Sequence, residues 1–181
     1  MQVEAVFAGF GGQGVLLAGK LLAEVAMTMG KEVVWLPSYG PEMRGGTANC
    51  TVIVADEPIA SPIVSNPRDA VVMNRPSFEK FCRLQRPGGF AVINSSLINV
   101  KLERTDLKQI EVPANQIAIA NGSARSANMV MLGAYVGATG IVSFDDLIEQ
   151  AKHEFAKRPK LLPVNLKCLE DGYQLGRSAA A

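Results

Sequence analysis

Residues 33–54 read VVWLPSYGPEMRGGTANCTVIV, and this stretch decides much of the fold. Its two ends, Val33–Leu36 and Cys50–Val54, are rich in β-branched residues and predict strands. The connection between them holds two prolines and three glycines, and it is too short for the helix that a parallel crossover needs. The two strands should therefore run antiparallel. The polar loop that joins them, Ser38–Gly46, is longer than a hairpin requires, and loops of that kind on a rigid scaffold tend to contact something.

Strands and helices alternate on both sides of this stretch. A glycine turn separates a first buried strand from a first helix, and Pro76 opens a later helix. The pattern predicts an α/β fold: a three-layer, Rossmann-like, mostly parallel sheet with one antiparallel strand and a helical C-terminal third. The other main predicted elements are strands at Val3–Ala8, Asp69–Met73, Phe90–Ile93 and Gln109–Val112, and helices at Val15–Met29, Ala114–Ala120, Ser126–Ala138, Ser143–Phe155 and Val164–Arg177.

Composition limits the class of protein. With 181 residues, of which 48% are hydrophobic, the chain should form a single ordered domain (1–181) without needing disulfides. A net charge of +1 without a basic stripe argues against nucleic-acid binding. The three cysteines have no metal or redox spacing, which favours buried thiols in a reducing compartment. No apolar run approaches the ~20 residues of a membrane helix, and no signal-like segment opens the chain, so we expect a soluble, cytoplasmic protein.

Gly9, Gly11 and Gly14 match G-x-G-x-x-G between a strand and a helix. Glycines in this position let backbone N–H groups approach an anion at the positive end of the helix. A dinucleotide site also needs an acidic residue where the second strand ends, and here that place holds Pro37 and Ser38. Three interpretations remain open: an NAD(P) site, a site for another phosphate-bearing ligand, and a purely structural tight turn.

Other catalytic patterns are weak. Residues 14–20 match G-x-x-x-x-G-K, but Leu21 follows where a phosphate-binding loop needs Ser or Thr for magnesium. His153 is the single histidine and lies in a predicted surface helix, so a nucleophile would have no convincing base. No cluster of His, Cys or carboxylates has metal-ligand spacing. We therefore predict no catalytic residue and no metal site in this chain.

A ligand is most easily accommodated where the predicted parallel strands end, because open α/β sheets bind ligands along that edge. Three segments are expected at this edge: the glycine turn Gly9–Gly14, the Ser38–Gly46 loop, and Asn74, which follows the predicted strand Asp69–Met73. Arg44 would bring a positive charge, with an ion pair to Glu42 as the alternative. The candidate cofactor-binding residues are Gly9, Gly11, Gly12, Gln13, Gly14, Ser38, Arg44 and Asn74.

Taken together, these segments resemble the gamma subunit of 2-oxoacid:ferredoxin oxidoreductases. The Ser38–Ala48 block is long and unusual, and it is the most specific part of the resemblance, which extends over essentially the whole chain. Within the family, the chain is most similar to the 2-oxoglutarate type, although pyruvate, branched-chain and indolepyruvate relatives carry similar blocks. The segments that carry the resemblance are Gly9–Val15, Trp35–Pro37, Ser38–Ala48, Pro58–Pro62, Asn74–Ser77 and Asn128–Gly133.

The resemblance implies a non-catalytic subunit of a larger complex. Such complexes convert a 2-oxoacid and coenzyme A into acyl-CoA, carbon dioxide and reduced ferredoxin, using thiamine diphosphate, Mg²⁺ and iron–sulfur clusters held by other subunits. The implied partners are alpha and beta subunits, with a ferredoxin-like delta subunit as a further candidate, and ferredoxin through the complex. This chain would serve assembly, with contact to coenzyme A as a candidate second role. The alternatives are a stand-alone CoA- or nucleotide-binding module and an NAD(P)-dependent enzyme.

Overall fold

The computed structural model describes residues 1–40 and 46–181. Within these residues, six strands form one sheet in the order β2-β3-β1-β4-β5-β6. Only β3 runs opposite to the others, because it pairs antiparallel with both β1 and β2 while the remaining pairs are parallel. The strands are β1 (Gln2–Phe10), β2 (Glu32–Tyr39), β3 (Thr47–Ala55), β4 (Asp69–Val72), β5 (Phe90–Asn94) and β6 (Lys108–Val112).

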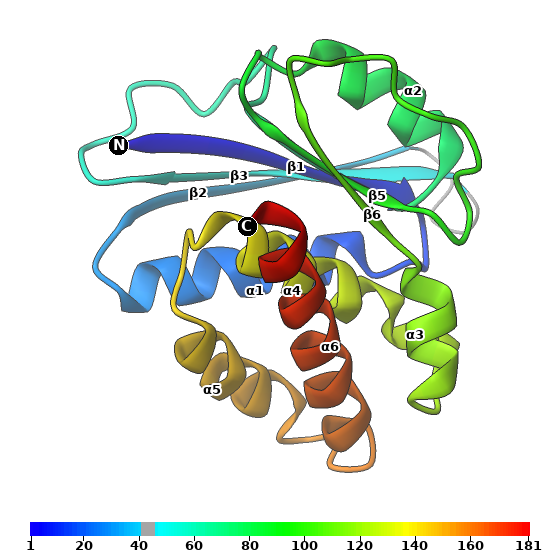
Figure 1. Ribbon diagram of the computed structural model, residues 1–181. Coiled ribbons are helices and arrows are strands. Elements are labelled where there is room, and N and C mark those ends of the chain that lie inside the picture. Colours follow the sequence, from blue (N-terminus) through cyan, green and yellow to red (C-terminus); the bar gives the residue numbers. More distant parts are fainter. Residues whose placement is uncertain (41–45) are drawn as a thin grey trace.

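Helices cover the two faces of the sheet unequally (Figure 1). One face carries α2, whereas the other carries α1 and α4, with α5 and α6 packed outside them. This arrangement confirms the predicted α/β class, the mostly parallel sheet with one reversed strand and the helical C-terminal third. The helices are α1 (Val15–Thr28), α2 (Arg75–Leu84), α3 (Ala114–Ala120), a 3₁₀ turn (Ala124–Ser126), α4 (Ala127–Thr139), α5 (Phe144–Phe155) and α6 (Leu162–Ala180).

The alternation of side chains along β1 builds two cores. Val3, Ala5 and Phe7 face α1 and α4, in the larger cluster, whereas Val6 and Ala8 belong to a smaller cluster with residues of α2. None of the helices in the described residues combines the length and the apolar character that crossing a membrane requires.

The glycine turn and the Ser38–Gly46 loop would form one surface if the first two parallel strands were adjacent. They are not adjacent, because β3 lies between β1 and β2. They nevertheless run in the same direction, since both are antiparallel to β3. The glycine turn after β1 and the loop after β2 therefore leave the same edge of the sheet, about two strand spacings or ~10 Å apart.

Candidate functional site

The glycine turn joins β1 to α1 with a geometry that depends on its glycines. Gly12 and Gly14 have φ angles of 95° and 74°, in the region that favours glycine. Gly9 lies inside β1, and a Cβ there would come within 2.5 Å of the Gln13 Oε1 atom and 2.9 Å of the Met73 Cβ atom. The pattern thus corresponds to a tight turn. The positive φ of Gly12 also means that adding a β-branched side chain there would strain the backbone, although a Cβ would meet no atom of residues 1–40 and 46–181 within 4 Å.

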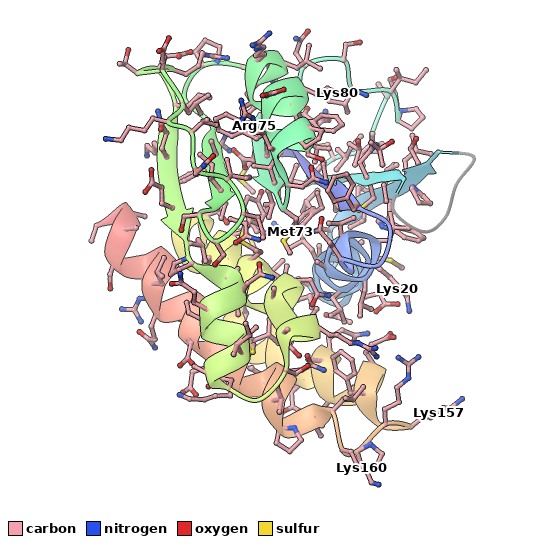
Figure 2. The ribbon with its side chains drawn as sticks, turned by 90° about the vertical axis from the view of Figure 1, so that its right-hand side faces the viewer. Lys20, Met73, Arg75, Lys80, Lys157 and Lys160 are labelled. Atoms are coloured by element: carbon pink, nitrogen blue, oxygen red, sulfur yellow. The ribbon has the colours of Figure 1, made fainter. Side chains whose placement is uncertain are left out.

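Gln13 holds the turn closed. Its side-chain oxygen accepts a hydrogen bond from the Phe10 backbone N–H (2.7 Å), and its amide nitrogen donates to the Met73 carbonyl (3.4 Å). The carbonyl of Gly14, which caps α1, accepts a hydrogen bond from the Asn128 side chain at the start of α4 (3.1 Å). The turn is therefore fixed to β4 and to α4. Figure 2 looks onto this edge, with Met73 near its centre and α1 seen almost end-on beside it.

One flank of the predicted binding loop is bonded to this turn, and the two flanks are bonded to each other. The Gly11 backbone N–H donates to the Gly46 carbonyl (2.8 Å), and the Gly40 N–H donates to the Thr47 carbonyl (3.0 Å). Ser38 is not in a loop but in β2, opposite Asn49 and exposed. Arg44 and Glu42 lie outside the described residues, so their predicted roles stay predictions.

Asn74 has a structural task. It is 3% exposed, and its Oδ1 atom accepts a hydrogen bond from the Ser77 N–H (2.9 Å), which caps α2. Its Nδ2 atom has no partner among the described residues. Asn74 follows Met73 directly in the chain and forms the N-cap of α2. Among the described residues its hydrogen bond is to the start of α2, and its predicted role in cofactor binding stays a prediction.

Two hollows flank the end of β1, and Gly12 borders both. The first is an apolar groove of about 560 Å³ on the β3 side, lined by Phe10, Trp35 and Pro37 together with the first turn of α1. The second is a smaller cavity of about 170 Å³ on the β4 side, which includes Gln13 and Arg125. The candidate site is thus two neighbouring depressions with different chemistry.

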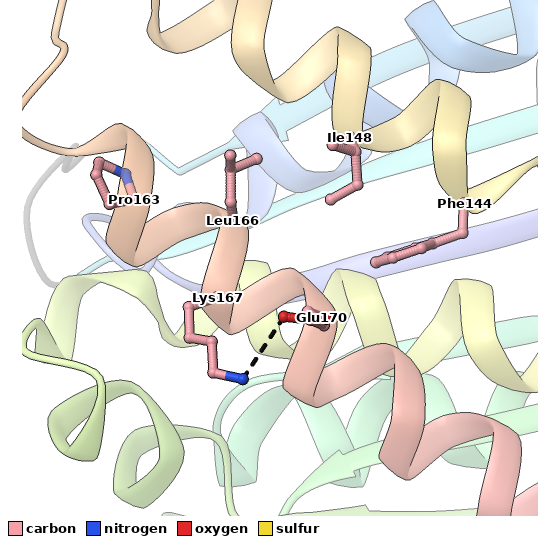
Figure 3. A pocket seen from close by; sticks show the side chains of 6 residues that line it. All are labelled: Phe144, Ile148, Pro163, Leu166, Lys167 and Glu170. Atoms are coloured by element: carbon pink, nitrogen blue, oxygen red, sulfur yellow. Dashed lines mark ion pairs between the residues drawn. The ribbon is translucent and has the colours of Figure 1, made fainter.

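A further depression lies far from the strand ends, between α5 and α6 (Figure 3). It measures about 400 Å³ and is lined by Phe144, Ile148 and Leu166, with the Lys167–Glu170 ion pair (3.5 Å) at its border. These side chains come from two amphipathic surface helices, and the depression lacks convergent polar groups beyond that pair.

The topology argues against the dinucleotide interpretation. In a Rossmann site the acidic residue follows a strand that lies beside β1. Here the neighbours of β1 are β3 and β4, and β2 ends in Pro37, Ser38 and Tyr39. The G-x-x-x-x-G-K match is also structural, because Val15 to Lys20 form the first turns of α1 and Lys20 pairs with Glu154 of α5 (2.9 Å).

The thiols are poorly suited to catalysis. Cys50, Cys82 and Cys168 are free, buried and located on β3, α2 and α6. Burial raises the pKa of the Cys50 and Cys82 thiols to about 12, and it also raises the pKa of Cys168. Among the described residues, no three His, Cys, Asp or Glu side chains come close enough to hold a metal ion.

Sequence reasoning missed several residues of this edge. Asn115 and Arg125 line the smaller cavity, and Asn128 binds the turn, yet none was a candidate. For Asn115 a signal existed, because it follows the predicted edge strand that became β6. Arg125 and Asn128 meet the turn only through the packing of α4, which no local pattern specifies.

Comparisons with known proteins agree with this architecture. Residues 4–175 match the family described as pyruvate ferredoxin/flavodoxin oxidoreductase. Ketoisovalerate oxidoreductase subunit VorA of Methanothermobacter marburgensis is 39% identical over 180 residues, which cover 97% of this chain but 37% of VorA. 2-Oxoglutarate synthase subunit KorC of Methanocaldococcus jannaschii is 32% identical over 180 residues, which cover 98% of this chain and 95% of KorC. The chain thus spans just over a third of VorA but nearly all of KorC.

Solved structures of two oxidoreductases are similar to this chain in fold. The gamma subunit of a keto/oxoacid ferredoxin oxidoreductase from Geobacter sulfurreducens superposes with a TM-score of 0.84 at 28% identity, covering 97% of this chain and 99% of that one. A 2-oxoglutarate:ferredoxin oxidoreductase from Magnetococcus marinus, solved with 2-oxoglutarate, coenzyme A and succinyl-CoA, shares the fold with a TM-score of 0.89 at 24% identity. In that case the match covers 98% of this chain and 31% of the other. The chain therefore belongs to the pyruvate ferredoxin/flavodoxin oxidoreductase family.

Proposed function

We propose that this chain, as one domain, is the non-catalytic gamma subunit of a complex that oxidatively decarboxylates a 2-oxoacid. The reaction joins the acyl group to coenzyme A, releases carbon dioxide and passes the electrons to ferredoxin. The observation that carries the proposal is the end-to-end match with separate chains, which covers 95% of KorC and 99% of the Geobacter gamma subunit. In VorA, by contrast, the matching unit is part of a longer polypeptide.

Other subunits would supply the redox chemistry. An iron–sulfur cluster needs a set of thiolates, and the cysteines here lie on three separate elements with raised pKa values. Alpha and beta subunits, together with a ferredoxin-like delta subunit where one exists, would hold thiamine diphosphate, Mg²⁺ and the clusters. Buried free thiols also suit a reducing, cytoplasmic setting.

The second part of the proposal is a contact with coenzyme A at the apolar groove. Its volume of about 560 Å³ lies in the usual range of small-molecule sites. Phe10, Trp35 and Pro37 would contact the apolar arm of the cofactor, while the glycine turn at the start of α1 offers backbone dipoles to a phosphate. When bound, coenzyme A supplies the thiol that accepts the acyl group.

2-Oxoglutarate is the first substrate to test, because KorC matches over nearly its whole length. A branched-chain 2-oxoacid is the second candidate, since VorA has the higher identity, 39% against 32%. An NAD(P)-dependent enzyme is disfavoured because β2 does not lie beside β1.

The test is an activity assay of the isolated chain and of the complex with its co-expressed partners. Each 2-oxoacid would be supplied with coenzyme A, thiamine diphosphate, Mg²⁺ and a dye acceptor. The complex should turn over one of the acids, and the isolated chain should show no turnover. Turnover by the isolated chain, or a fully active complex that lacks this chain, would contradict the proposal.

A further inference from the structure

The smaller cavity beside the glycine turn has a chemistry of its own. It measures about 170 Å³ and is lined by Gly12, Gln13, Met73, Asn115 and Arg125, together with Ala124 and Ala127. These residues come from the turn, from the end of β4, and from α3 and the segment that leads into α4. The apolar groove lies on the β3 side of β1, whereas this cavity lies on the β4 side.

A buried hydrogen-bond network fixes the orientation of the Asn115 amide. Asn94 is fully buried, and its Oδ1 atom accepts a hydrogen bond from the Ser96 N–H (3.3 Å). The Asn94 Nδ2 atom must therefore be the donor to the Met73 carbonyl (3.3 Å) and to the Asn115 Oδ1 atom (2.8 Å). Because the Asn115 oxygen is the acceptor in this pair, its NH₂ group remains available to the cavity.

Gln13 is oriented in the same way. Its Oε1 atom accepts from the Phe10 N–H, and its Nε2 atom uses one hydrogen on the Met73 carbonyl, so a second N–H remains. Arg125 is exposed, and none of the ion pairs within residues 1–40 and 46–181 includes it. In the part of the chain that the structure describes, the cavity thus offers donors and one cation, and no carboxylate lines it.

We infer that this cavity binds a single oxyanion group, a carboxylate or a phosphate, through Arg125, Asn115 and Gln13. A carboxylate or phosphate oxygen accepts hydrogen bonds and matches amide and guanidinium donors. The volume is below the range of drug-sized sites, so it suits one such group and a few waters rather than a nucleotide. The inference goes beyond the proposed function, because it concerns a different hollow and requires no partner subunit.

The test is a binding measurement on the isolated full chain. Inorganic phosphate and, separately, acetate would be titrated at constant ionic strength, with chloride as the reference, while ¹H–¹⁵N NMR spectra are recorded. The signals expected to shift are the Gly12 amide, the side-chain amides of Gln13 and Asn115, and the Nε–H of Arg125. Shifts with phosphate alone would indicate a phosphate site, and shifts with both anions a general oxyanion site, and either result supports the inference.

Variants make the test specific. Arg125→Gln should weaken binding about tenfold or more, because a charge-assisted hydrogen bond is lost. Asn115→Asp keeps the acceptor for Asn94 but replaces the free NH₂ group by a carboxylate oxygen, so it should weaken binding as well. Arg158→Gln, an exposed residue between α5 and α6, removes the same charge at a distant place and should leave binding unchanged.

Two results would overturn the inference. The first is the absence of localised shifts with either anion. The second is an equal loss of binding in Arg125→Gln and Arg158→Gln, which would indicate general charge attraction. Neither result would bear on assembly or turnover of the complex, so the inference and the proposed function fail independently.

Discussion

Asp69, at the start of β4, carries a carboxylate that is only 1% exposed. It accepts hydrogen bonds from the Phe90 N–H and from the hydroxyl of Tyr135, both at 2.8 Å. Burial raises the pKa of Asp69 despite these donors. A raised pKa means that the folded state holds this proton more tightly than the unfolded chain. The resulting stabilisation is fully present below the ordinary value of 3.8 and is lost as the pH rises through the folded pKa.

Tyr135→Phe removes one donor from this carboxylate, so it should destabilise the protein by about 2 kcal/mol. It should also raise the pKa of Asp69 further. The difference in unfolding free energy between wild type and variant should therefore be larger at about pH 7 than at about pH 4. Urea titrations at both pH values measure it. Tyr173→Phe removes the same atom from a half-buried tyrosine whose hydroxyl has no carboxylate partner among the described hydrogen bonds, and it should have little effect. A pH-independent difference for Tyr135→Phe would refute this account.

At the residue scale, the features that could be predicted are those that depend on residues close together in the sequence. The glycine positions of the turn follow from their spacing, and the helix predicted to begin at Ser143 is capped by that side chain, which accepts a hydrogen bond from the Asp146 N–H. The bond from Asn128 to the Gly14 carbonyl joins residues 114 positions apart. Such contacts depend on how complete helices pack, and no short motif encodes them.

At the element scale, α4 and α6 are held at close range by glycines. A Cβ on Gly133 of α4 would come within 2.2 Å of the Leu169 carbonyl oxygen, and a Cβ on Gly172 of α6 within 2.0 Å of the Val130 carbonyl oxygen. Each helix thus meets the backbone of the other. The helix predicted at Val164–Arg177 lies within α6, and it buries Leu169 and Gly176. The glycines that set its distance from α4 were not distinguished in advance, because only the partner helix reveals their function.

Gly133→Ala should destabilise the protein by about 2 kcal/mol or more, since backbone atoms cannot move aside as a flexible side chain can. The clash should outweigh the gain of about 1 kcal/mol in helix propensity. The measurement is the urea midpoint. Gly40→Ala is the matched control, because the same methyl group there would meet no atom of the described residues closer than 3.7 Å. If the two variants unfold at similar urea concentrations, the close approach of α4 and α6 does not limit stability.

Two strands, β1 and β2, are longer than the sequence pattern predicted. β2 was predicted to stop at Leu36 before Pro37, but it continues to Tyr39. A proline is tolerated there because β2 is an edge strand, where one side of the backbone needs no ladder partner. β1 likewise extends through Gly9 to Phe10, because these residues pair with Ala48 and Thr47 of β3.

At the scale of the whole molecule, the strand order was the least predictable feature. The loop between β2 and β3 indicates that they pair, and the alternation of strands and helices indicates a parallel sheet. Neither pattern says that β3, rather than β2, lies beside β1. That choice depends on long-range pairing between Gln2–Phe10 and Thr47–Ala55, and it decides that the apolar groove opens next to an edge strand.

The β2 edge of the sheet exposes large apolar side chains, as the contact surface of the proposed partner subunits would require. Leu36 and Trp35 on β2 are 47% and 38% exposed, and Phe10 at the end of β1 is 37% exposed. An apolar edge strand is unusual on a protein that works alone, whereas surfaces that become buried in stable complexes are more apolar than ordinary surface. We therefore predict that the isolated chain exposes a sizeable apolar surface or self-associates.

Leu36→Asp should therefore weaken association with the partner subunits by about tenfold or more, because it removes an apolar contact and places a charge in the interface. Co-elution of the co-expressed subunits in size-exclusion chromatography measures the effect, and circular dichroism of the isolated variant checks its fold. Ile63→Asp is the matched control, since Ile63 is 78% exposed and lies beside Gln2 and Glu4, at the opposite end of β1. Wild-type co-elution of Leu36→Asp, or an equal loss in both variants, would show that the β2 edge is not the contact surface.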